Sequence, residues 1–342
     1  MASPNNRGFN TIQNSRVASR QKSETLQMYT LFGVIGLAVV TCILLVVMAI
    51  GGLTGNSDPK DNGPSGEKIE WGSFTVTATD TLSGDLVLVN NTHAYTFPAT
   101  NDHLGEIYAT WKPDPKLPAH PYVLSGISTY MDKDALIAMD KMLVDFYNAS
   151  GKDNVQVRDA YRTLEQQEGK TIQPGYSDHH TGLGCALMYD KDGHAYDLSI
   201  DSVYNWLFEN CHKYGFVIRY PDDKADITGV SEYNYYFRYV GIPHAAYMTQ
   251  EDLCMEEYIE ELKKYDHEKP LKITAEGKNY EVYYVAVEGS ATVKHPTNYA
   301  YTVSGTNEGG VVITVDRSTT LNEADSSEEG SAGVDTSEID EH

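Results

Sequence analysis

The chain has 342 residues, which is enough for one or two domains with sizeable cores. Its hydrophobic and aromatic fractions, 41% and 11%, are typical of a globular protein. Its formal net charge of −23 excludes nucleic acid as an expected partner, because a phosphate-binding surface needs an excess of Lys and Arg.

The first predicted element is an apolar stretch near the N-terminus. Residues 29–53 are almost wholly apolar, and no charged side chain occurs from Thr25 to Ser57. About 20 apolar residues cross the hydrocarbon of a bilayer, so the stretch predicts a transmembrane helix over residues 25–55. A cleaved signal peptide has a shorter apolar core with a cleavage site close behind it. A buried core helix rarely runs this long without a polar face.

The charges that flank this span predict its orientation. Basic side chains precede it at Arg7, Arg16, Arg20 and Lys22. The residues that follow it, Asp58, Lys60 and Asp61, carry no positive excess. The positive-inside rule therefore places residues 1–24 in the cytoplasm. We expect a single-pass protein of the cell membrane whose main domain is extracellular.

A polar linker rich in Gly and Pro covers residues 56–67 and leads into an expected α+β domain over residues 68–268. Alternating apolar residues predict strands over 73–78 and 85–90. Apolar residues at three- and four-residue spacing predict helices over 134–150 and 203–214. Gly151 suits the C-terminal cap of the first of these helices.

The last part of the chain changes character. Residues 269–317 contain the β-prone runs 278–287 and 310–315, which predict a small β appendage. Residues 318–342 hold eight acidic residues and no Lys or Arg. A segment of that composition is expected to be a disordered acidic tail.

The cysteines carry little information. Cys42 falls in the predicted span, which leaves Cys185, Cys211 and Cys254 in the main domain. One disulfide is possible, but three cysteines do not make a disulfide framework. We expect small buried side chains.

Four motifs follow one another in residues 155–248. They are Ala160-Tyr-Arg-Thr-Leu-Glu-Gln-Gln167, Ser177-Asp-His179 with Thr181-Gly-Leu183, Trp206 to Pro221, and Phe237-Arg-Tyr-Val-Gly241 with Pro243-His-Ala245. In this order and spacing they resemble the extracytoplasmic zinc D-alanyl-D-alanine carboxypeptidases of the VanY type, which trim the stem peptides of bacterial cell wall. The resemblance implies a DD-peptidase-like fold, an antiparallel sheet with packed helices.

The family's chemistry needs a zinc ion with three protein ligands and one position for water, whose pKa the metal lowers. The resemblance implies a His, an Asp seven residues later and a distant second His as ligands. A Glu three residues before that second His is the general base.

Carried over position by position, only the first ligand is retained, as His179. Ala186 stands at the Asp position, Tyr233 at the Glu position and Tyr236 at the second His position. A methyl group offers no lone pair, and a phenol is a poor base at neutral pH. We therefore expect a degenerate, catalytically inactive member with no metal cofactor. The motif residues that flank each lost position, such as Gly182 and Arg238, still fit the alignment.

Other residues of the family's cleft remain. The resemblance makes Arg162, Gln167, Ser177 and His179 candidates for binding a D-Ala-type terminus, with Arg162 holding the carboxylate. Arg162 could instead pair with an acid of the core. The expected partner is a stem peptide of peptidoglycan or a cell-wall protein.

Two alternatives to a non-catalytic binder or regulator stay open. The first is an active zinc carboxypeptidase with relocated ligands, in which case zinc is the cofactor. Its replacement donors would come from His180, His194, Asp197, His212 and His244. The second is a protein-interaction scaffold whose old cleft is filled.

Overall fold

The structure is a computed structural model that describes residues 68–107, 121–126, 129–198, 202–231 and 233–321. All of these residues fall in one unit, residues 62–342. The predicted cytoplasmic tail, transmembrane helix and linker lie outside the described residues, as does most of the predicted acidic tail. No helix within the described part of the chain is long and apolar enough to cross a bilayer.

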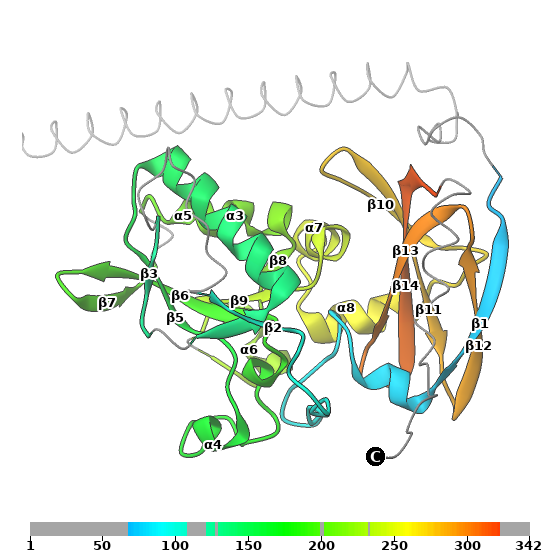
Figure 1. Cartoon of the computed structure of the whole chain (residues 1–342), viewed down its shortest axis with the longest axis horizontal. Helices are drawn as coiled ribbons and strands as arrows, with labels where there is room; N and C mark the ends of the chain where they lie inside the picture. Colours follow the sequence, from blue (N-terminus) through cyan, green and yellow to red (C-terminus); the bar gives the residue numbers. More distant parts are fainter. Residues whose placement is uncertain (1–67, 108–120, 127–128, 199–201, 232, 322–342) are drawn as a thin grey trace, which may run out of the picture. The chain divides into compact units, whose positions relative to one another are not determined.

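A six-stranded sheet forms the centre of the first half of the fold (Figure 1). Its strands are β3 (Val123–Leu124), β5 (Val155–Asp159), β6 (Gly184–Lys191), β7 (His194–Asp197), β8 (Phe216–Ile218) and β9 (Tyr236–Tyr239). The order is β3-β5-β6-β9-β8, with β7 paired to β6. Every pair is antiparallel except β3 with β5. A separate antiparallel pair joins β2 (Leu104–Glu106) to β4 (Tyr130–Asp132). The predicted α+β class with an antiparallel sheet is confirmed.

The main helix of this half is α3 (Lys133–Ser150), which agrees with the predicted helix over 134–150. Asp132 caps its first turn by accepting hydrogen bonds from two backbone amides, and Gly151 ends it in the left-handed conformation. Its buried apolar face packs into the same core as the inner face of β5 and β6.

Shorter helices connect the strands and lead into the last third of the chain. They are α4 (Leu164–Gln167), η2 (Asp178–Thr181), α5 (Asn205–Asn210), η3 (Cys211–Tyr214), η4 (Asp222–Lys224), α6 (Ala225–Thr228), α7 (Ile242–Gln250) and α8 (Met255–Leu262). The predicted helix over 203–214 is observed as α5 continued by η3.

A second antiparallel sheet holds the C-terminal strands. Its members are β10 (Leu271–Ala275), β11 (Lys278–Ala286), β13 (Tyr299–Gly305) and β14 (Gly310–Thr320), in the order β10-β11-β14-β13. The predicted β-prone runs are therefore strands, and β14 extends three residues past position 317.

The first described strand, β1 (Trp71–Thr77), pairs with β12 (Ser290–Pro296), as Figure 1 shows. It is followed by η1 (Ala78–Leu82). The predicted strand near 73–78 exists, but its partner is in the C-terminal β region and not in the six-stranded sheet.

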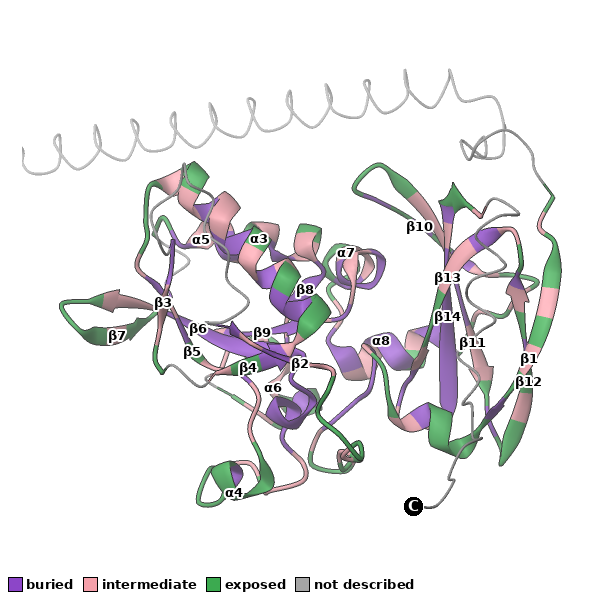
Figure 2. Cartoon of the chain, viewed as in Figure 1, coloured by how far each residue is buried: buried purple, intermediate pink, exposed green. Residues whose placement is uncertain are grey.

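Helices α7 and α8 share a core with the C-terminal β region. Ile273, Val282 and Val312 pack in one cluster with Met248 and Tyr258 of these helices. Figure 2 shows the buried face of β14 that contributes to such packing. Because apolar side chains of both parts leave water together, the β region is part of the folded unit and not a loosely attached appendage.

His244 adds a polar link inside that core. Its Nδ1 lies 2.7 Å from the hydroxyl of Tyr258, and its Nε2 lies 2.9 Å from Oγ1 of Thr314 on β14. Burial lowers the pKa of His244 to about 3, so the ring is neutral.

The predicted strand over 85–90 is wrong. This segment joins no sheet. Asp85 and Leu86 lie in a turn, and the side chains of the segment are divided between two cores: Leu86 and Leu88 pack in the core with α7 and α8, and Val87 packs in the core with α3. Buried guanidinium groups bind the backbone carbonyls that a neighbouring strand would otherwise bind. Arg238 donates to the carbonyls of Asp85 and Val87 at 2.8 and 3.2 Å. The backbone is thus satisfied without a ladder.

Cys185, Cys211 and Cys254 are buried free thiols. The expectation that they are small buried side chains is confirmed, and none of the three forms a disulfide.

Candidate functional site

Strands β6 and β9 bring the family's catalytic positions together. Ala186 on β6 is the direct register partner of Tyr236 on β9. The ring of His179, from η2, lies 4.5 Å from the ring of Tyr236, and the ring of Tyr233 lies 5.4 Å from it, both between centroids. Four residues separated by up to 57 positions thus meet at one point, as the position-by-position alignment predicts.

His179 is held in one tautomer. Its Nδ1 lies 2.6 Å from the carbonyl oxygen of Ala160, which can only accept, so Nδ1 carries the proton. The lone pair is therefore on Nε2, which lies 2.7 Å from the hydroxyl of Tyr233. Tyr233 donates this hydrogen bond, so the Nε2 lone pair, which is the one that could bind a metal, already accepts a hydrogen bond.

The surroundings keep His179 neutral. The residue is buried, and burial lowers its pKa to about 4, helped by the positive charge of Arg162 and opposed by the hydrogen bond to Ala160. Burial likewise raises the pKa of the Tyr233 phenol, so its hydroxyl keeps its proton at neutral pH.

Tyr236 fills the space beside the strand. It is completely buried, and burial raises its pKa well above the ordinary value. A Cβ atom added to Gly184 would lie 2.6 Å from the Tyr236 hydroxyl and 2.8 Å from its Cζ. The phenol therefore fits only because position 184 has no side chain.

The aromatic packing extends to two more rings. Tyr220 stacks on Tyr233 at 5.6 Å and Tyr235 meets Tyr233 edge-on at 4.9 Å, both between centroids. We call Tyr220, Tyr233, Tyr235 and Tyr236 the tyrosine cluster. Offset and edge-on pairs of this kind stabilise a packed core by about 0.5–1.5 kcal/mol each beyond their buried area. The cluster surrounds Ala186 and His179 with aromatic side chains.

Zinc does not fit these residues. It takes nitrogen, sulfur or carboxylate donors at about 2.0–2.3 Å in tetrahedral geometry. Of the three ligand positions, only His179 carries such a donor, and Tyr233 already occupies its lone pair. No group of three His, Cys, Asp or Glu side chains that could hold a metal occurs in the described ranges.

The proposed replacement donors form no metal site with His179 among the described residues. Nδ1 of His180 lies 2.7 Å from the carbonyl oxygen of Arg162, and its Nε2 accepts from the amide of Gly175 at 3.0 Å. His244 is bound to Tyr258 and Thr314 as described above. The remaining candidates are His194 and Asp197 on β7 and His212 on η3. They belong to no group of possible metal ligands with His179 in the described part of the chain.

A cavity of about 430 Å³ opens beside the tyrosine cluster. Arg162, Gln167 and His179 line it together with Tyr233 and Tyr235. Three of the four predicted ligand-binding residues therefore face one space.

The fourth, Ser177, does not line this cavity. It is completely buried, and its Oγ has no hydrogen-bond partner among the described residues. It lies in the protein interior.

Arg162 is already partnered. Its Nη2 lies 3.0 Å from Oδ2 of the partly exposed Asp159, and its Nη1 donates to Oε1 of Gln167 at 3.1 Å. Gln167 in turn donates from Nε2 to the carbonyl of Ile172 at 2.8 Å. The guanidinium is held at the cavity wall by Asp159 and Gln167, and it also interacts with the Tyr233 hydroxyl.

Sequence reasoning missed an ion network directly beneath the site. Asp178, adjacent to His179, is completely buried and accepts from Arg238 through Oδ1. Arg219 lies 3.6 Å from the same oxygen and binds Glu256 at 2.7 Å. Asp178 and Arg238 both lie within the motifs that match the family. The motifs do not indicate that these two residues pair with each other.

Similar proteins are found by sequence. The profile of the VanY family, described as D-alanyl-D-alanine carboxypeptidase, matches residues 170–242. A D-alanyl-D-alanine carboxypeptidase of Enterococcus faecium is 30% identical over 250 residues, which are 70% of this chain and 78% of the relative. Another, from Enterococcus faecalis (strain ATCC 700802 / V583), is 36% identical over 141 residues, which are 41% of this chain and 47% of that relative.

A solved structure is similar in fold. The vancomycin-resistance D,D-dipeptidase VanXYg, crystallised with a D-Ala-D-Ala phosphinate analog, aligns with a TM-score of 0.61 at 25% identity. The alignment covers 72% of this chain and 99% of that one. The likeness therefore extends well beyond the residues that the family profile matches.

Proposed function

The chain belongs to the VanY family of D-alanyl-D-alanine carboxypeptidases, and from this premise we propose that it is a non-catalytic member that binds cell-wall peptide. The observation that carries the proposal is the hydrogen bond between the Tyr233 hydroxyl and Nε2 of His179, at 2.7 Å. In this arrangement a phenol stands where the family's mechanism needs a carboxylate base. The one retained metal-binding atom, Nε2 of His179, already accepts its hydrogen bond. Ala186 and Tyr236 supply no replacement ligand.

The binding function rests on what remains around the cavity. Arg162 presents a guanidinium at the wall of the cavity, and a planar donor of this kind suits a carboxylate. The relative VanXYg was crystallised with a D-Ala-D-Ala phosphinate analog. We infer that the terminal carboxylate of a stem peptide of peptidoglycan is the group that this cavity accepts.

The place of action is part of the proposal. The apolar stretch 29–53, with basic residues before it, supports a membrane anchor and a main domain outside the cell. Stem peptides are assembled into cell wall on that side, so anchor and partner agree.

The catalytic test uses the full-length protein with added zinc and a stem pentapeptide. We expect no release of D-Ala and no bound zinc by metal analysis. The matched control is Ala186→Asp/Tyr233→Glu/Tyr236→His, which returns the family's ligands and base and should bind zinc. About one zinc per unmodified chain, with turnover abolished by His179→Ala, would establish an active enzyme with relocated ligands.

A protein-interaction scaffold is the second candidate, favoured by the partners that Arg162 already has in Asp159 and Gln167. Calorimetry with a D-Ala-D-Ala-terminated peptide separates it from the binder. Heat that disappears in Arg162→Ala supports peptide binding. No heat with the unmodified protein supports the scaffold.

A further inference from the structure

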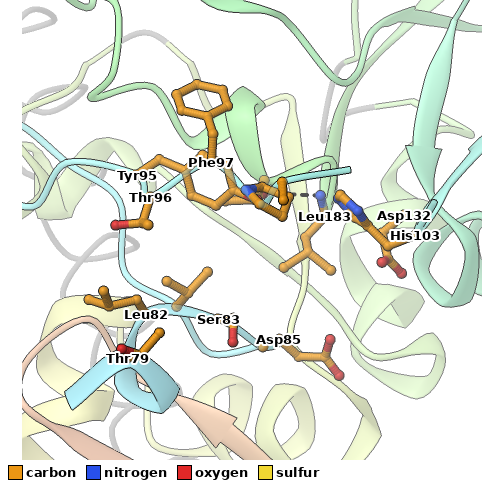
Figure 3. Close-up of a pocket in the computed structure, with 15 residues that line it drawn as sticks. Thr79, Leu82, Ser83, Asp85, Tyr95, Thr96, Phe97, His103, Asp132 and Leu183 are labelled. Carbon is orange, nitrogen blue, oxygen red and sulfur yellow. Dashed lines mark hydrogen bonds between the residues drawn. The ribbon is translucent and has the colours of Figure 1, made fainter. Parts of the chain in front are cut away.

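A larger cavity lies away from the tyrosine cluster. Its volume is about 550 Å³, which is within the range of small-molecule sites. It shares no lining residue with the cavity at Arg162. Figure 3 shows Leu82, Tyr95 and Thr96 toward one end, and Asp85 and Asp132 toward the other.

The walls of this cavity are largely apolar, but one end is acidic. Leu82, Phe97 and Leu183 contribute apolar surface. Asp85 and Asp132 contribute carboxylates, and no Lys or Arg is among the described residues that line the space. An apolar chamber with a negative end is complementary to a molecule that is apolar at one end and cationic at the other.

Asp85 is the carboxylate that lacks a partner. Within the described ranges its side chain makes no hydrogen bond and no ion pair, whereas Asp132 is occupied in capping α3. The nearby Arg238 is committed elsewhere: it binds the Asp178 carboxylate and the backbone carbonyls of Asp85 and Val87. A carboxylate in this position gains from a cation that enters the cavity.

The charges around Asp85 also favour a cationic ligand. Burial raises its pKa to about 6, and the negative charges of Asp132 and Asp134 add to this, while Arg238 opposes it. His103 lines the same end of the cavity. The group is therefore ionised at neutral pH but poorly solvated, and an ammonium partner would relieve that cost.

The backbone that carries Asp85 is fixed before any ligand arrives. Gly84 has φ +117, and a Cβ there would lie 2.4 Å from Oγ of Ser304. The same Oγ accepts from the amide of Leu86 at 2.9 Å, and the carbonyl of Ser83 accepts from the amide of Gly305 at 2.7 Å. These contacts pin the turn to β13, so little order must be imposed on binding.

We propose that this cavity is a second binding site, for a small organic ammonium with an apolar body. The ammonium pairs with the carboxylate of Asp85, and the apolar body packs against Leu82, Phe97 and Leu183. The site is independent of the tyrosine cluster and of peptide binding at Arg162.

The test uses 2-phenylethylamine as the probe and isothermal calorimetry on the full-length protein at neutral pH. We expect a Kd of about 1 mM or tighter. The neutral 2-phenylethanol has the same shape and should bind about tenfold more weakly, and the anionic 3-phenylpropionate should not bind. Asp85→Asn should weaken the amine about tenfold and leave the alcohol unchanged.

Two further variants locate the site. Thr96→Trp places a large ring at the exposed rim of the cavity and should block the amine. Asp153→Asn makes the same chemical change as Asp85→Asn at an exposed position outside the cavity and should have no effect. Unfolding midpoints of all variants establish that they are folded. Absence of amine binding, equal binding of amine and alcohol, or full binding by Asp85→Asn would overturn the proposal.

Discussion

The tyrosine cluster and the ion network beneath it are one residue apart in sequence and opposite in chemistry. His179 packs against the first, where a neutral imidazole and neutral phenols contact one another. Asp178 belongs to the second, where a buried carboxylate holds Arg238 and Arg219. The first is a neutral layer held by aromatic contacts and one hydrogen bond, and the second is a charged layer held by buried ion pairs. We expect the loss of a buried charge to destabilise the fold more than a change in the neutral layer.

The strongest test of this comparison removes the buried carboxylate of the charged layer. Asp178→Ala leaves two buried guanidinium groups without their shared carboxylate, which should cost about 3–5 kcal/mol of unfolding free energy. Urea denaturation followed by circular dichroism measures the loss. Glu256→Gln, at the less buried end of the network, is the control and should cost less. Equal, small losses in both variants would show that the network is not a stabilising layer.

The neutral layer can be tested by pH. His179 has a pKa of about 4 in the fold against about 6.5 in the unfolded chain, so the unfolded chain binds more protons between those values. Its contribution to stability is complete above pH 6.5 and is lost as the pH falls toward 4, by at most about 3 kcal/mol.

The measurement is the difference between the unmodified protein and His179→Gln, because other groups titrate in the same range. Burial lowers the pKa of His244 to about 3, and it raises the pKa of Asp85 and of Asp140 to about 6 with the opposite sign. His179→Gln should flatten the decline below pH 6.5. His194→Gln makes the same substitution at an exposed position and is the matched control.

The smallest expected effect concerns the fit of the tyrosine cluster to β6. Gly184→Ala brings a methyl group into the Tyr236 phenol and should cost about 1–3 kcal/mol through overpacking. Gly126→Ala, where a Cβ would meet nothing within 4 Å, is the matched control. A smaller residue at position 236, as in Tyr236→Leu, should reduce the cost of Gly184→Ala. A neutral Gly184→Ala in the unmodified protein would mean that the cluster is loosely packed.

Local patterns in the sequence were sufficient to predict several features of the structure. The apolar spacing of residues 134–150 and the glycine at 151 predicted α3 closely, since amphipathic periodicity and capping act over a few residues. The motif order predicted the family. The segment over 85–90 was misjudged because its alternating pattern suits a strand, yet its side chains divide between two cores and its carbonyls bind Arg238.

Only the tertiary structure decided what surrounds His179 and what lies beneath it. The Tyr233 hydroxyl meets His179 across 54 positions, and Arg238 meets Asp178 across 60. The pairing of β1 with β12 spans more than 200 residues. Contacts over such separations depend on which groups lose water together and which polar atoms then need a partner. The sequence determined which side chains stand at the motif positions, and packing determined that the phenols meet His179 there.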